Sequence, residues 1–213
     1  MKSIYAIRIV LMSVLLIMFT ECSFCFAEEQ TDLNDTIYGA ESFRDTYNRM
    51  AENLGMRIRL TECGSIGGNA KGAAFGIKDT LEYWHSPLCI DTFGDDARLK
   101  RVIVFVDLGT KDKNGMSNYT REINRGREMM TVALCSVCEI PFSDSWEMVE
   151  LGMKQALDSP AHYPDGGVCS KTYPFHITDK NGRSRNFVFS ADHLSCGTPR
   201  SDMLTLMLIA YKR

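Results

Sequence analysis

Two cysteines carry the clearest chemical signal in this sequence, because they stand two residues apart in Cys135-Ser136-Val137-Cys138. A C-x-x-C pair exchanges thiols and disulfides when its first thiolate is stabilised, as it is at the beginning of a helix. Here the pair falls near the end of a predicted helix, where the negative end of the helix dipole raises the pKa of a thiol. We therefore favour structural cysteines at Cys135 and Cys138, and keep a thiol–disulfide oxidoreductase as the alternative.

Residues 1–27 predict a cleavable export signal. A short basic stretch precedes an apolar run, 9–19, which is shorter than the about 20 residues that a membrane-spanning helix needs. Such a run is typical of the apolar region of a signal peptide. We expect cleavage after Ala27 and a periplasmic or extracellular protein. Lipid anchoring at Cys22 or Cys25 and an uncleaved anchor are the alternatives.

The cysteines downstream of this signal predict a disulfide framework. An even number of cysteines in an exported domain usually forms paired bridges. Chain order favours a bridge between Cys63 and Cys89, with the others joining the central helix to the C-terminal strands. A structural zinc site would need a second close pair of cysteines, which the sequence lacks. The disulfide candidates are Cys63, Cys89, Cys135, Cys138, Cys169 and Cys196.

Other reactive residues do not assemble into a recognisable catalytic motif. Cys63 and His193 could form a hydrolase pair only if Cys63 stayed unbridged. The sequence has no G-x-S-x-G motif, and the glycine-rich segment 63–72 lacks the spacing of a phosphate-binding loop. A hydrolase whose residues meet only in the fold stays an open alternative, and we predict no cofactor and no metal ion.

Three segments have the apolar spacing of amphipathic helices. Ser42 and Asp45 provide an S-x-x-D start signal for the first helix, and Gly126 weakens the second. Each helix stops at or before a glycine or proline. The predicted helices are 42–54, 117–140 and 143–158.

Strand patterns surround these helices. Most of them alternate apolar and polar residues, but 99–108 is nearly all apolar and β-branched, which indicates a strand covered on both faces. The glycines of 63–72 predict a loop between the first two strands. The predicted strands are 56–61, 73–84, 88–93, 99–108, 169–178, 185–191 and 203–211.

The segment 179–182, between the predicted strands 169–178 and 185–191, predicts a specific hairpin. A three-residue loop with Gly182 in the left-handed conformation sets the register of its two strands. Tyr173 then lies opposite Phe189. Phe175 likewise lies opposite Phe187, so that aromatic rings stack on one face of the sheet.

The order of elements predicts an α+β fold in which a predominantly antiparallel sheet carries its helices on one side and is stabilised by disulfides. We expect a signal peptide at 1–27, a flexible leader at 28–40 and a single domain at 41–213. No further segment after the signal is apolar enough to span a membrane.

Charge and composition exclude some functions. The formal net charge of −3 argues against general nucleic-acid binding, which usually needs a basic surface. Asn34 stands out only as a glycan acceptor, in Asn34-Asp35-Thr36, if the exporting cell is eukaryotic. We expect a non-enzymatic module that binds a protein or envelope component, such as an inhibitor, an immunity factor or an assembly accessory. The alternative is an exported enzyme, either an oxidoreductase using Cys135 and Cys138 or an unassigned hydrolase.

Overall fold

A computed structural model of the chain describes residues 30–34, 36–66, 71–77, 88–92, 98–109, 119–158, 161–162, 171–178, 182, 184–195 and 203–211. The first 29 residues lie outside this set, so the export signal and its cleavage after Ala27 stay predictions. None of the described helices is long and apolar enough to cross a membrane.

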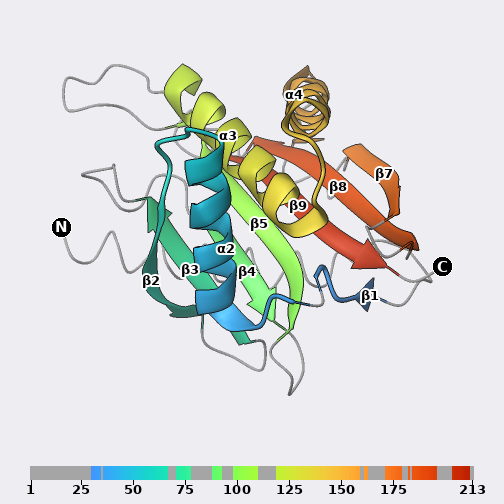
Figure 1. Ribbon diagram of the computed structural model, residues 1–213. Helices are drawn as coiled ribbons and strands as arrows, with labels where there is room; N and C mark the ends of the chain where they lie inside the picture. Colours follow the sequence, from blue (N-terminus) through green and yellow to red (C-terminus); the bar gives the residue numbers. More distant parts are fainter. Residues whose placement is uncertain are drawn as a thin grey trace. The chain divides into compact units, whose positions relative to one another are not determined.

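The described elements follow the predicted order of helices and strands, with two short strands added (Figure 1). The helices are α2 (Gly39–Asn53), α3 (Tyr119–Cys138) and α4 (Phe142–Asp158). The strands are β1 (Gln30–Thr31), β2 (Leu60–Ile66), β3 (Lys71–Ile77), β4 (Leu88–Thr92), β5 (Leu99–Asp107), β6 (Ala161–His162), β7 (Lys171–Thr178), β8 (Ser184–Ser195) and β9 (Met203–Tyr211).

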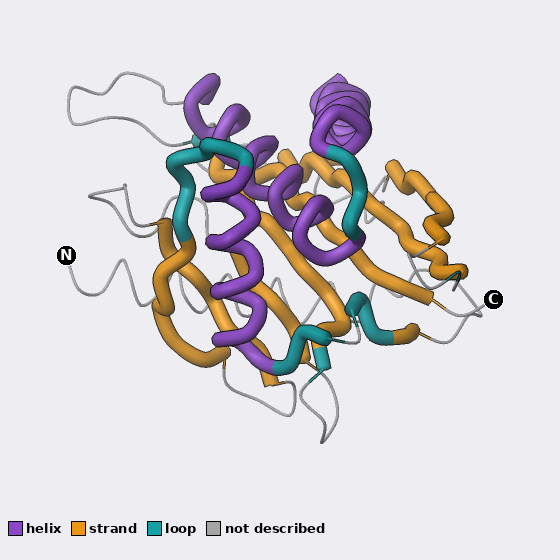
Figure 2. The backbone as a smooth tube through the Cα atoms, in the orientation of Figure 1, coloured by secondary structure: helices purple, strands orange, loops and turns teal. Residues whose placement is uncertain are grey.

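All described strands belong to one sheet. Their order is β2-β3-β4-β5-β9-β8-β6, with β1 paired to β9 and β7 paired to β8. Among these pairs only β6 and β8 run parallel. The three helices lie over the same face of the sheet (Figures 1 and 2). The predicted α+β fold, with a predominantly antiparallel sheet and helices on one side, is therefore confirmed.

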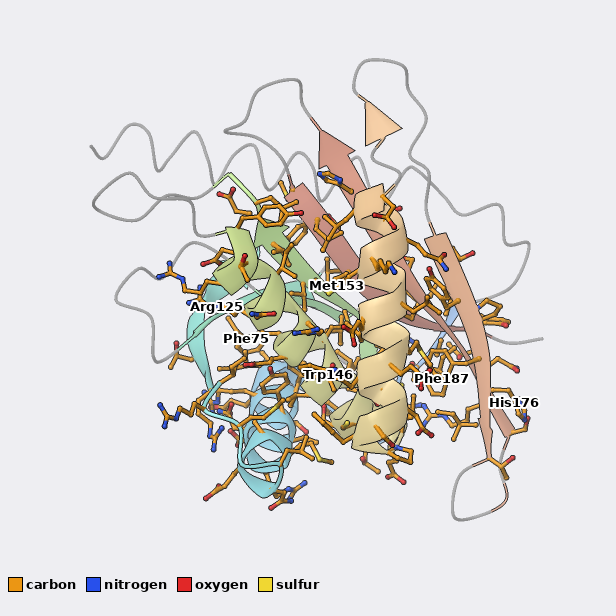
Figure 3. The ribbon with its side chains drawn as sticks, turned by 90° about the horizontal axis from the view of Figure 1, so that it is seen from above. Phe75, Arg125, Trp146, Met153, His176 and Phe187 are labelled. Atoms are coloured by element: carbon orange, nitrogen blue, oxygen red, sulfur yellow. The ribbon has the colours of Figure 1, made fainter. Side chains whose placement is uncertain are left out.

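The core fills the layer between the helices and the sheet. Phe75, Met153 and Phe187, which are labelled in Figure 3, belong to this core. The central strand β5 is buried along almost its whole length. Its Ile103 and Phe105, which alternate with the core residues and therefore face away from the helices, are only 2% and 3% exposed. The prediction that β5 is covered on both faces is confirmed.

The hairpin of β7 and β8 has the predicted register. Tyr173 lies opposite Phe189, and Phe175 lies opposite Phe187. Both ring pairs stack, with centroids 5.8 and 5.3 Å apart. Gly182 has the left-handed conformation that the turn requires, with φ of 77°. Turn chemistry and aromatic pairing together were enough to fix this part of the sheet.

Helix α2 begins earlier than its start signal predicts. Its N-cap is Tyr38, and no side chain caps the helix. Tyr38 instead forms a backbone bridge with Arg98, next to β5. The start of α2 is thus fixed by a long-range backbone contact, and the prediction of a cap at Ser42 and Asp45 is wrong. Gly55, with φ of 68°, follows the end of the helix as predicted.

The first long strand is shifted along the chain. Residues 56–59 are not in a strand, and the side chain of Arg59 donates hydrogen bonds to the carbonyls of Met56 and Ile58 there. Pairing starts at Leu60, whose backbone N–H and carbonyl also bond the amide of Asn48 on α2. Strands β2 and β3 extend into 63–66 and 71–72, so the loop predicted there is shorter, and its remainder, 67–70, lies outside the described residues.

The leader is also more ordered than its polar sequence predicts. Gln30 and Thr31 pair with the end of β9, and Leu33 and Ile37 are 0% and 1% exposed. These contacts involve partners far along the chain, which local periodicity does not reveal. From residue 30 onward, the described part of this segment belongs to the fold.

Candidate functional site

A cleft of about 840 Å³ opens between α2 and the turn that joins α3 to α4. One wall is a stripe along α2, where Ser42, Thr46, Arg49 and Asn53 recur at the three- and four-residue spacing of one helix face. The sequence pattern marks these positions only as the solvent side of an amphipathic helix. The complete lining is Asn34, Thr36, Ser42, Thr46, Arg49, Met50, Asn53, Leu54, Cys135, Ser136, Glu139, Ile140, Pro141 and Phe142.

The opposite wall is the carboxyl end of α3 and the turn that follows it. Cys135 and Ser136 belong to the last turn of α3, and the Ser136 hydroxyl donates to the carbonyl of Ala133. Glu139 has a φ of 57°, a left-handed conformation that lets the chain leave the helix. The exposed side chain of Glu139 thus stands at the mouth of the cleft.

The floor comes from the segment before α2, which we call the strap (residues 30–34 and 36–37). Asn34 is buried, and its Nδ2 donates to the carbonyl of Val137 at 2.8 Å. Its Oδ1 accepts hydrogen bonds from the backbone N–H and the hydroxyl of Thr36, at 2.9 and 2.7 Å. Asn34 therefore joins the strap to the end of α3, and in the folded protein its Nδ2 is not accessible to a glycan-transferring enzyme.

Two cations hold the strap against the sheet. Arg98 donates to Asp32 at 2.8 Å, and Lys100 donates to the other carboxylate oxygen. Partial burial raises the pKa of Asp32, but the hydrogen bonds and charges of Lys100 and Arg98 outweigh it, so the pKa lies below the usual 3.8. The ionised form of Asp32 therefore stabilises the folded state.

Acid should loosen the strap through Asp32. Because the pKa of Asp32 is lower in the folded state, its contribution is present above the usual pKa and is lost as pH falls through the folded value. We expect the free energy of unfolding of the Asp32→Asn variant to fall less than that of the wild type between about pH 5 and about pH 2. Urea unfolding at several pH values measures this, and parallel pH profiles would contradict it.

The two described thiols are in an unfavourable environment for redox chemistry. Cys135 and Cys138 are both free and are 2% and 4% exposed. Burial raises the pKa of Cys135, although its hydrogen bond to the Ser145 hydroxyl at 3.5 Å opposes this. Burial also raises the pKa of Cys138, and the charge of Arg185 only partly opposes it. As predicted, the pair lies at the carboxyl end of a helix, and both thiols stay protonated at neutral pH.

Neither thiol should react while the protein is folded. We expect Cys135 and Cys138 to escape alkylation by iodoacetamide at neutral pH, because thiolates are the reactive form and both sulfurs are buried. After unfolding in guanidinium, both should be labelled completely. Peptide mass mapping with and without denaturant measures this, and labelling of Cys135 in the native protein would contradict it.

The other cysteines leave the disulfide framework as a prediction. Cys63 lies on β2 and Cys89 on β4, where it pairs with Ala74 of the intervening strand β3. Strands lie about 4.8 Å apart, so Cα atoms separated by one strand are about 10 Å apart, beyond the about 7 Å that a disulfide tolerates. The sheet thus argues against a bridge between Cys63 and Cys89. Cys169 and Cys196 lie outside the described residues.

The structure does not bring the remaining candidates together. Cys63 on β2 and His193 on β8 are separated by four strands, which excludes the hydrolase pair. His176 lies on β7 at the outer edge of the sheet (Figure 3), where its ring contacts Asn186 and Ser184. Among the described residues, no group of three or more His, Cys, Asp and Glu side chains could hold a metal ion.

Within the described part of the chain, the cleft is therefore our candidate functional site. It offers hydroxyls, two amides, one cation and one anion, a set suited to binding by hydrogen bonds and charge rather than to a covalent step. No protein-family model, no curated protein and no solved structure matches the chain.

Proposed function

We propose that this protein is an exported binding module, and that it holds an extended segment of a partner protein in the cleft between α2 and the α3–α4 turn. The cleft carries this proposal. Its volume of about 840 Å³ lies within the range of ligand pockets. Export to the periplasm or the cell exterior is part of the proposal and rests on the signal pattern of residues 1–27.

The α2 wall matches the dimensions of an extended peptide. Residues 42 to 53 rise about 16 Å along the helix axis. An extended chain covers that distance with about five residues, because each residue advances about 3.3 Å. The polar groups of Ser42, Thr46 and Asn53 can bond the backbone of such a segment. Met50 and Leu54 add apolar contacts to the same wall.

The thiol environment disfavours the oxidoreductase alternative. An oxidoreductase needs a stabilised thiolate that a substrate can reach. Burial instead raises the pKa of both Cys135 and Cys138. We therefore propose that Cys135 serves the cleft as part of its packed wall.

A blocked cleft tests the proposal. Thr46→Phe places a large ring in the middle of the α2 wall, whereas Thr120→Phe makes the same change at an exposed position of α3 outside the cleft. We expect a partner from the exporting cell to be retained by the wild type and by Thr120→Phe and to be lost with Thr46→Phe. Circular dichroism checks that both variants fold.

Two outcomes would refute the proposal. One is the absence of any partner that the wild type retains specifically. The other is equal capture of the partner by Thr46→Phe and Thr120→Phe, which would place the binding surface outside the cleft.

A further inference from the structure

We infer that the segment bound in the cleft is anchored by a basic side chain, lysine or arginine, which lies against the carboxyl end of α3 beside Glu139. This inference rests on the proposed function and specifies the chemistry of the partner. The α3 wall of the cleft carries the anion Glu139, whereas the α2 wall opposite carries the cation Arg49.

Backbone groups make the α3 wall negative. The last carbonyls of a helix have no intrahelical donor, and the helix dipole places about half a negative charge at that end. Asn34 covers the carbonyl of Val137 with a neutral amide. Helix α3 has no basic residue in its last turn, so its own side chains do not neutralise this end. The charge of Arg185 acts on Cys138, but the Arg185 guanidinium already donates hydrogen bonds to the carbonyls of Asp32 and Leu33 in the strap.

A side chain adds to the same potential. Glu139 follows α3 directly, lines the cleft and is exposed. No ion pair joins it to any described residue, and Arg49, the one cation of the lining, lies on the opposite wall without bonding it. The Glu139 carboxylate and the carboxyl end of α3 therefore create negative electrostatic potential in the same part of the cleft. A cationic side chain of the partner can bind there.

Arg49 sets the orientation of the segment. Its guanidinium stands on the α2 wall and suits a carbonyl or an acidic side chain of the partner. An acidic anchor alone would bond Arg49 but would meet repulsion from Glu139 and from the end of α3. A basic anchor, with its carbonyls toward α2, satisfies both walls. The net charge of −3 also favours encounter with a basic partner.

Synthetic peptides test the anchor. The probes are fluorescein-labelled decapeptides of Gly, Ser, Thr and Leu that differ only in one central residue, which is Lys, Arg, Gln or Glu. We expect the Lys and Arg peptides to bind the wild type about tenfold more tightly than the Gln peptide, and the Glu peptide to bind most weakly. Salt should weaken the Lys peptide most, because its preference is electrostatic. Fluorescence anisotropy measures each affinity.

Matched variants identify the anchor point. Glu139→Gln should remove the preference for Lys over Gln peptides, whereas Glu147→Gln, at an exposed position of α4 outside the cleft, should preserve it. Thr46→Phe should weaken every peptide. Peptide binding that Thr46→Phe blocks but that shows no preference for Lys, or keeps it in Glu139→Gln, would overturn the anchor and leave the cleft intact. Absence of binding, or binding that Thr46→Phe does not affect, would overturn the cleft itself.

Discussion

Replacing Gly126 with alanine should destabilise this protein, although a glycine-to-alanine change in an ordinary exposed helix stabilises that helix by about 1 kcal/mol. Helix α3 crosses β5 at this glycine. A Cβ atom placed on Gly126 would stand 2.3 Å from Cγ2 of Val106. Valine in a strand has little rotamer freedom, so the helix or the strand must shift. We expect the free energy of unfolding to fall by about 1–3 kcal/mol, as in other overpacked cores.

The double variant separates packing from helix propensity. Val106→Ala removes the obstructing methyl group and alone costs stability, because Val106 is fully buried. In that background Gly126→Ala should become stabilising, because the propensity of alanine then acts without a clash. Urea unfolding of the four proteins measures the cycle. Equal effects of Gly126→Ala in both backgrounds would show that the close approach to β5 does not govern this position.

Gly126 also shows what local sequence patterns leave out. The pattern identifies it only as a weak point of a helix, whereas the structure makes it a place where α3 packs directly against Val106 of β5. The choice of glycine depends on Val106, which lies on another element. The existence of a helix, in contrast, depends mainly on local sequence, and the spacing of apolar residues predicted all three described helices.

The same contrast between local patterns and long-range contacts explains which parts of the fold were predicted and which were missed. The β7–β8 hairpin was predictable because its turn and its aromatic pairs are neighbours in sequence. The strap was not, because Asn34 bonds Val137, a residue 103 positions away. Buried Leu33 and Ile37 stand in a mostly polar segment, where two apolar residues are too few to establish a pattern.

The candidate site was predictable only in part. The sequence pattern placed Cys135 and Cys138 correctly at the end of a helix, where we expected the helix dipole to disfavour their thiolates. In the structure the main cause of the raised pKa values is burial, which the sequence pattern did not predict. The pattern did not predict the cleft either, because the α2 stripe from Ser42 to Asn53 has the composition of an ordinary solvent-facing surface. The α2 stripe lines a cleft only because Glu139 and its turn lie opposite it. The position of that turn depends on how α3 packs on β5.

Arg125→Met should produce the other large loss of stability. Glu122, in the first turn of α3, is 0% exposed, and Arg125 donates to both of its carboxylate oxygens at 3.0 Å (Figure 3 labels Arg125). Methionine keeps the aliphatic part of the side chain but leaves the buried carboxylate without this partner. Loss of one member of a buried pair costs about 3–5 kcal/mol. We expect a value near the lower end, because Arg121 also contacts Glu122, at 3.4 Å.

Two comparisons assign this loss to the buried charge. Arg127→Met makes the same substitution in an ion pair whose partner, Glu150, is 55% exposed, so water solvates the carboxylate that remains. This variant also loses the contact of Arg127 with the Trp146 ring and should cost at most about 2 kcal/mol. Adding Glu122→Gln to Arg125→Met should restore most of the stability, because a neutral amide needs no counter-charge. Urea unfolding of these variants measures both effects. A cost no greater than that of Arg127→Met, or no recovery with Glu122→Gln, would mean that Arg125 does not stabilise α3 by neutralising Glu122.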